Sequence, residues 1–142
     1  MKLSTKTRYG MRLMIDLAGH YGCGSVALKD VAKRQDISKK YLEQVVSPLV
    51  SAGLLRVSRG YLGGYTLSRT PEKITCADIV SATEDGLCLL DCTSGKVVCD
   101  RADCCPSQYI WRGLEENLCS YLENITLQDI LEHESTTSTY VI

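Results

Sequence analysis

Hydrophobic residues near the start of the chain repeat with the spacing of a helix. Four of them follow one another at four-residue steps, which places them on one helix face: Tyr9, Leu13, Leu17 and Tyr21. Ser4 precedes the pattern as an N-cap, and the glycines at 22 and 24 end it. The sequence therefore predicts a first helix that begins after Ser4.

Two further helices are predicted over residues 28–35 and within residues 38–53. Ser38 can cap the second of them, and Gly53 stands where a left-handed residue commonly ends a helix. Pro48 falls inside that helix and predicts a kink or a break near it. Two short helices joined by a tight turn, the second well capped, are typical of a helix-turn-helix.

A β-hairpin is predicted next, with strand-like runs at 54–58 and 65–68 around the turn "RGYLGG". Its glycines permit a positive φ or a close approach of the backbone, while Arg56 and Arg59 place positive charge at its tip. A phosphate-binding loop would need a following Lys-Ser or Lys-Thr pair and a helix, and neither is present. The hairpin is therefore predicted to be the wing of a winged helix.

The outer face of the third helix carries side chains that suit DNA. Lysines neutralise phosphates, Gln44 can bond adenine, and Glu43 can accept from cytosine N4. A plain three-helix core would show a similar pattern up to the wing. The candidate DNA-binding residues are Ser38, Lys39, Lys40, Tyr41, Glu43, Gln44, Arg56, Arg59 and Gly60.

Charge divides the 142-residue chain into two halves. Residues 1–70 hold twelve Lys or Arg against four Asp or Glu, a net +8. Residues 71–142 hold four against thirteen, a net −9, so the formal total is −1. A strongly basic half indicates a polyanionic partner, although two solvated surfaces could differ in charge by chance.

The acidic half contains one short helix, one long helix and a second short helix. Thr75 and Asp78 can form a capping box that opens the first at 75–84, and Thr126 can cap the last. From about Ser107, apolar residues follow helical spacing over several turns, and this stripe needs a partner. A second copy of the chain is the economical partner, and folding back onto its own domain is the alternative.

Five of the eight cysteines lie between positions 88 and 105. None of them forms a Cys-x-x-Cys pair, which disfavours a zinc ribbon. The N-terminal segment has no uninterrupted apolar run, so a cytoplasmic protein with reduced thiols is expected. Thiolates in a flexible loop suit an iron–sulfur cluster. A zinc site and a thiol-redox switch are alternative interpretations of the same loop.

Three stretches carry a resemblance to a known family. "STKTRYGMRLMIDLA", "SKKYLEQVVSPLVSAGLL" and "RGYLGGYTL" resemble the Rrf2 family of bacterial transcription regulators, and the similarity continues to about residue 131. The resemblance implies a homodimer that binds partly palindromic promoter DNA, with the third helix in the major groove and the wing in the minor groove. Four residues match the recognition helix and two match the wing: Ser38, Tyr41, Glu43, Gln44, Arg59 and Gly60.

The resemblance is strongest to IscR-type members and implies the ligands of a cluster. Cys92, Cys99 and Cys105 match their three cysteines, with one extra residue between the first two. Gln108 stands where those members have histidine, so Cys104 is the nearest replacement as fourth ligand, followed by Cys88. The implied cofactor is an iron–sulfur cluster, with 2Fe-2S favoured over 4Fe-4S. A given preparation of the protein can lack this cluster.

The predicted fold is mainly α with a small β-hairpin wing: a winged helix-turn-helix plus a long dimerisation helix. Residues 1–70 form the DNA-binding domain, 71–105 the connecting helix and cysteine-rich sensing loop, 106–133 the dimerisation and final helices, and 134–142 a polar tail. No catalytic or nucleotide-binding motif stands out, so an enzyme is not expected. No membrane partner is expected either. The predicted function is a dimeric transcription regulator controlled by an iron–sulfur cluster; the alternatives are a thiol-redox or zinc switch, or a CymR-like regulator acting through a protein partner.

Overall fold

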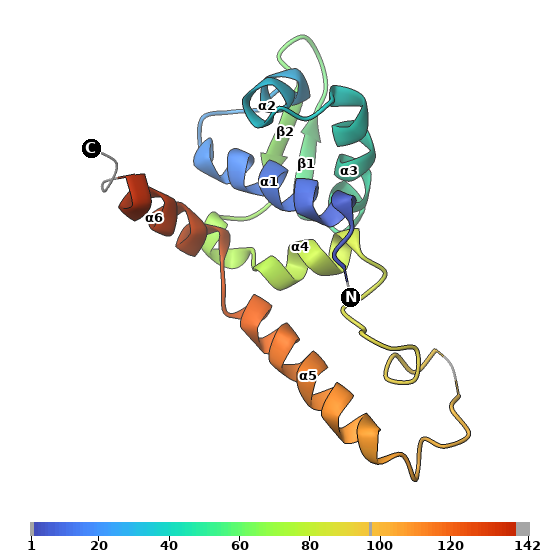
Figure 1. Ribbon diagram of the computed structural model, residues 1–142. Helices are drawn as coiled ribbons and strands as arrows, with labels where there is room; N and C mark the ends of the chain where they lie inside the picture. Colours follow the sequence, from blue (N-terminus) through green and yellow to red (C-terminus); the bar gives the residue numbers. More distant parts are fainter. Residues whose placement is uncertain (1, 97, 139–142) are drawn as a thin grey trace.

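The computed structural model describes residues 2–96 and 98–138 and shows a mainly helical protein with one two-stranded hairpin (Figure 1). The elements are α1 Thr5–Gly19, α2 Leu28–Gln35, α3 Lys39–Ser51, β1 Leu55–Ser58, β2 Gly64–Leu67, a 3-10 turn Pro71–Lys73, α4 Cys76–Thr83, α5 Pro106–Glu123 and α6 Leu127–Ser138. The predicted fold class is confirmed. Within the described residues, no helix combines the length and apolar character needed to cross a membrane.

Side-chain caps start the helices where the sequence places them. The hydroxyls of Ser4 and Ser38 accept hydrogen bonds from the backbone N–H three residues later, at 3.1 and 3.2 Å. Thr75 and Asp78 form a complete capping box, with both reciprocal bonds present. Each cap satisfies an N–H group that the first helical turn leaves without a partner, which explains why these boundaries are readable locally.

One apolar core joins the two halves of the chain. Leu13 and Met14 of α1 are fully buried, and they belong to the same cluster as Leu42 of α3 and Ile79 of α4. The α6 helix contributes Leu127, also fully buried. A short bridge between Thr75 and Thr126 brings the starts of α4 and α6 together. The core therefore contains residues from both sides of position 70.

The hairpin is held by the pairing of its two strands and by a contact with the segment before α2. β1 and β2 pair antiparallel from Leu55 opposite Leu67 to Ser58 opposite Gly64. Tyr65 also exchanges two backbone hydrogen bonds with Val26, at 2.9 and 3.0 Å. A Cβ on Gly64 would lie 2.2 Å from the Val26 carbonyl oxygen, so only glycine fits this approach. The wing is thus anchored to the segment before α2.

Two details differ from the sequence prediction. Pro48 does not break α3, which runs as one helix to Ser51, because the flanking Val45, Val46 and Leu49 are buried in the core. The predicted tail from 134 is helical as far as Ser138, and residues 139–142 lie outside the described residues. Hydroxyls of residues 135–137 each donate to the carbonyl four residues earlier, which keeps this polar segment on the helix.

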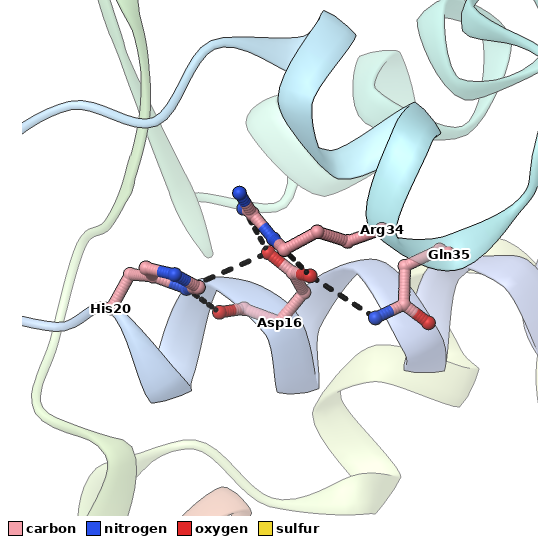
Figure 2. A network of polar contacts seen from close by, with 4 residues as sticks. All are labelled: Asp16, His20, Arg34 and Gln35. Carbon is pink, nitrogen blue, oxygen red and sulfur yellow. Dashed lines mark hydrogen bonds and ion pairs between the residues drawn. The ribbon is translucent and has the colours of Figure 1, made fainter.

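A buried carboxylate ties α1 to α2 (Figure 2). Asp16 is 8% exposed, and both its oxygens accept from the Arg34 guanidinium, at 2.7 and 3.0 Å. Gln35 donates to the same carboxylate at 3.0 Å. Burial raises the pKa of Asp16, but the hydrogen bonds from Arg34 and Gln35 and the charge of Arg34 outweigh it, and the pKa is lowered. The network fixes the first helix of the helix-turn-helix on α1.

Asp16→Asn should lower the free energy of unfolding by roughly 2 kcal/mol at neutral pH, because it removes a charged, bidentate partner of Arg34. Since the pKa of Asp16 is lower in the folded protein, its contribution is complete above the ordinary carboxyl pKa and is lost as the pH falls through the lowered value. Denaturant unfolding across the acidic range should show the difference from wild type shrinking. Exposed Asp36, whose φ of 52° also suits asparagine, provides the control Asp36→Asn, which should change little. A pH-independent difference would contradict this account.

Candidate DNA-binding surface and cysteine loop

The outer face of α3 is open to solvent along most of its predicted DNA-binding residues. Ser38, Lys39, Lys40, Glu43 and Gln44 are exposed, while the opposite face of the helix is buried. Lys39 Nζ lies 3.7 Å from Glu43 Oε1, an exposed pair that contributes little to stability. The two side chains can therefore separate readily to meet other partners.

Tyr41 differs from its neighbours on α3. It is half-buried and packs edge-on against Tyr9 of α1, with ring centroids 5.3 Å apart. Arg12 also lies over the Tyr9 ring, 5.5 Å from its centroid. Tyr41 thus connects the recognition helix to α1, and only part of its ring reaches the exposed face.

A hollow of about 290 Å³ separates α3 from the wing. Lys29, Lys39 and Glu43 line it together with backbone of the glycines at 63 and 64. Lys29, at the start of α2, adds a second cation beside Lys39, and its place here was not predicted. The only signal for it is its charge, since the sequence alone does not show which side of α2 faces the wing.

The wing tip carries both predicted and unpredicted residues. Arg59 and Gly60 lie in the turn, and Gly60 has a φ of +110°, which favours glycine. Arg56 is exposed, but it lies within β1 opposite Thr66 rather than at the tip where the sequence placed it. Tyr61 and Leu62, both almost fully exposed, take the tip position instead. Exposed apolar side chains on a turn indicate a contact surface.

The cysteine loop leaves the end of α4, extends away from the winged body and leads into α5 (Figure 1). Cys92, Cys99 and Cys105 are half-exposed, and Cys88 and Cys104 are exposed; all are free thiols. Within residues 2–96 and 98–138, no three His, Cys, Asp or Glu side chains come together as a metal site. The structure therefore places the predicted ligands in one loop without gathering them.

Cys105 occupies a distinct position at the N-cap of α5. Its sulfur lies 3.1 Å from the Ser107 hydroxyl. Hydrogen bonds from this hydroxyl and from the backbone of Gln108 and Ser107 lower the pKa of the Cys105 thiol. The lower pKa favours the thiolate, which is the form that binds metals. Gln108 itself, in place of histidine, follows one turn into the helix.

Two glutamates that the sequence did not single out hold the start of this region in place. Glu84, directly before the loop, accepts from the Ser4 backbone N–H at 2.7 Å and from the Thr7 hydroxyl at 2.6 Å. Glu115 of α5 accepts from the Leu89 backbone N–H at 2.6 Å. These contacts join residues far apart in the chain, so no local pattern could have revealed them.

Comparison with known proteins identifies the same family. The model of the Rrf2 family, described as "Iron-dependent Transcriptional regulator", matches residues 3–133. The HTH-type transcriptional regulator IscR of Xenorhabdus nematophila is 37% identical over 134 residues, which cover 94% of this chain and 81% of that protein.

Solved structures agree. The global cysteine regulator CymR (YrzC) of B. subtilis has a TM-score of 0.78 and 36% identity, covering 94% of this chain and 98% of that one. T. potens IscR has a TM-score of 0.77 and 36% identity, covering 94% and 88%. These relatives are transcriptional regulators and not enzymes. The chain belongs to the Rrf2 family of winged-helix transcription regulators.

Proposed function

We propose that this regulator is a homodimer that binds double-stranded promoter DNA and that an iron–sulfur cluster in its cysteine loop sets its affinity for the operator. DNA binding is supported by the exposed face of α3, which bears lysines and lies beside an anchored wing with Arg59 in its turn. The helix suits a major groove, and the wing suits the neighbouring backbone and minor groove. Lys29 would add a phosphate contact between them.

The proposed dimer interface is the exposed surface of α5. Within the part of the chain that the structure describes, this 18-residue helix has no buried residue. Ile110, Leu114 and Tyr121 are exposed and lie on one side of it, at 59%, 45% and 66% of their surface. An exposed apolar stripe of this length marks an interaction surface. A second copy related by a two-fold axis would cover it and would present two recognition helices to a palindromic site.

The proposed cluster is supported by the chemistry of the cysteine thiols in the loop. Cys92, Cys99 and Cys105 are accessible, and the lowered pKa of Cys105 favours its thiolate. Sulfur is the ligand that iron–sulfur clusters prefer. The described part of the loop, residues 84–96 and 98–105, forms no helix or strand that would prevent these thiols from converging. When bound, a cluster would supply redox- and iron-sensitive chemistry. Cys104 is the nearest further thiol in the sequence and would supply the fourth ligand.

Two other functions share the same surfaces. A zinc or thiol-redox switch would use the same loop without a cluster. A CymR-like regulator would act through a protein partner. The likeness to CymR covers 94% of this chain and supports the shared fold, but it does not bear on a partner. The concentration of thiols in the loop favours control by metal or redox chemistry.

Arg59→Ala should weaken binding to every operator sequence and reduce the salt slope by about one, because it removes one phosphate contact. Glu43→Ala should instead change the ratio of affinities between related operators by roughly tenfold, because it removes a base contact. Fluorescence anisotropy at several salt concentrations measures both. Lys73→Ala, in the 3-10 turn beside α6, removes a charge elsewhere and should leave both quantities unchanged. The division of roles is wrong if Arg59→Ala and Glu43→Ala act alike.

Leu114→Glu should shift the protein from dimer to monomer in sedimentation velocity, because it places a charge in the apolar stripe of α5. Ser120→Glu is the matched control: it introduces the same side chain into the same helix, about 120° around its axis from Leu114. It should stay dimeric. A monomeric wild type, or equal dissociation by both variants, would contradict the proposed interface.

Anaerobic reconstitution with iron and sulfide should give a brown protein with visible absorbance, and Cys92→Ser and Cys105→Ser should each lose most of that absorbance. Iron and sulfide analysis then gives the type of cluster. Cys23→Ser, an exposed thiol between α1 and α2, provides the control and should keep the absorbance of wild type. A colourless wild-type product would overturn the cluster, while zinc retention or reversible thiol oxidation would favour the alternative switch.

A further inference from the structure

Glu115 holds the first part of the cysteine loop against α5. Its Oε1 accepts from the Leu89 backbone N–H at 2.6 Å and from the Thr93 hydroxyl. The hydrogen bond from Thr93 is the main cause of a lowered pKa of Glu115, assisted by the backbone of Leu89. The carboxylate therefore stays charged, and both bonds to the loop are charge-assisted. Residues 89–93 are fixed on one face of the helix.

This contact brings two cysteines to one place. Cys88 directly precedes Leu89, and Cys119 lies four residues after Glu115, on the same face of α5. Both cysteines line one hollow of about 540 Å³, together with Thr93 and Glu115. Cys88 is exposed, Cys119 is half-exposed, and neither is in a disulfide.

The surroundings give the two thiols different roles. Burial is the main cause of a raised pKa of Cys119, and the nearby charges of Glu123, Glu115 and Cys88 add to it. Cys119 therefore stays a protonated thiol under ordinary conditions. The open position of Cys88 makes it the first to meet a dissolved oxidant.

We propose that Cys88 and Cys119 are a redox-active pair which a peroxide closes into an intrachain disulfide. The pair is separate from the predicted ligands Cys92, Cys99 and Cys105, and this role would leave Cys104 as the fourth ligand. The Cys88 sulfur attacks one peroxide oxygen; the O–O bond breaks, and a sulfenic acid and one water form. The Cys119 sulfur then attacks the Cys88 sulfur; the S–S bond forms, the S–O bond breaks, and a second water leaves. Two thiols are oxidised, one peroxide is reduced, and the two thiol protons end in the two waters.

The geometry of α5 allows this without disturbing the proposed dimer. Tyr121 of the apolar stripe follows Cys119 by two residues, so the two side chains point about 160° apart around the helix. The apolar stripe is thus free while the loop lies on another face. The described residues of the loop, 84–96 and 98–105, form no helix or strand. Cys88 can therefore shift toward Cys119 to reach the Cα separation of a disulfide, about 4.4–6.8 Å.

The full-length, metal-free, reduced protein should be treated with hydrogen peroxide, alkylated and digested with trypsin without reduction. Cleavage after Arg112 leaves Cys119 as the one cysteine of its peptide, whereas the peptide 74–96 carries Cys76, Cys88 and Cys92. We expect most Cys119 to appear cross-linked to the peptide 74–96. Before digestion, the oxidised protein should have the mass of a monomer. Cys88→Ser should abolish this cross-link, and the matched Cys92→Ser should retain it.

Three results would overturn the pair: a cross-link that survives Cys88→Ser, a bond from Cys119 to another cysteine or to a second chain, or Cys119 that stays alkylatable while loop thiols oxidise. Its regulatory effect rests on the proposed function and has its own measurement. Oxidised wild type should differ from oxidised Cys88→Ser in operator affinity by roughly fivefold or more. Equal affinities with the cross-link formed refute only the regulatory effect, whereas no binding by the reduced protein refutes the proposed function and leaves the pair intact.

Discussion

The packing of α1 is the constraint on which the rest of the structure depends. Its fully buried Leu13 and Met14 share one cluster with side chains from α3, α4 and α6. Gly10 belongs to the same face: a Cβ there would lie 3.0 Å from the Thr83 methyl, so α4 approaches the α1 backbone closely. Each of these elements is too short to be stable alone in water. They become stable by burying their apolar faces against one central helix, so disturbing α1 would affect the DNA-binding surface and the acidic half together.

This arrangement gives the loop a short physical route to α3. Glu84 ends α4 and bonds to Ser4 and Thr7 at the start of α1. Two residues after Thr7, Tyr9 packs against Tyr41 on the recognition helix. A change that pulls on the loop would act on Glu84 first, because that residue directly precedes it. Contacts alone do not make a coupling; the route matters if bound and free forms of the loop place α1 differently.

The winged half was predictable because its signals are local. Ser4 caps α1, Ser38 caps α3, and the glycines of "RGYLGG" mark the turn of the wing; each is visible within a few residues of sequence. A break at Pro48 does not occur, because tertiary packing overrides the local preference. The tail predicted after 134 is helical, because hydroxyls bond back along it. The roles of Glu84 and Glu115 depend on partners 22 to 80 residues away, which no local pattern encodes. Whether the loop cysteines converge depends on such contacts as well.

In the acidic half, α5 and the cysteine loop have few packing contacts of their own and would gain them from binding partners. α5 buries no residue of its own among the described residues, and the loop is held mainly by single side chains such as Glu115. An element with so little buried surface has a low local free energy of opening, so ligands and bonds can change it at small cost. A partner chain, a metal and a disulfide would each restrict the same loop and helix. Because they act on one weakly packed region, they would compete or cooperate with one another, while the core around α1 keeps the DNA-binding surface folded in every state.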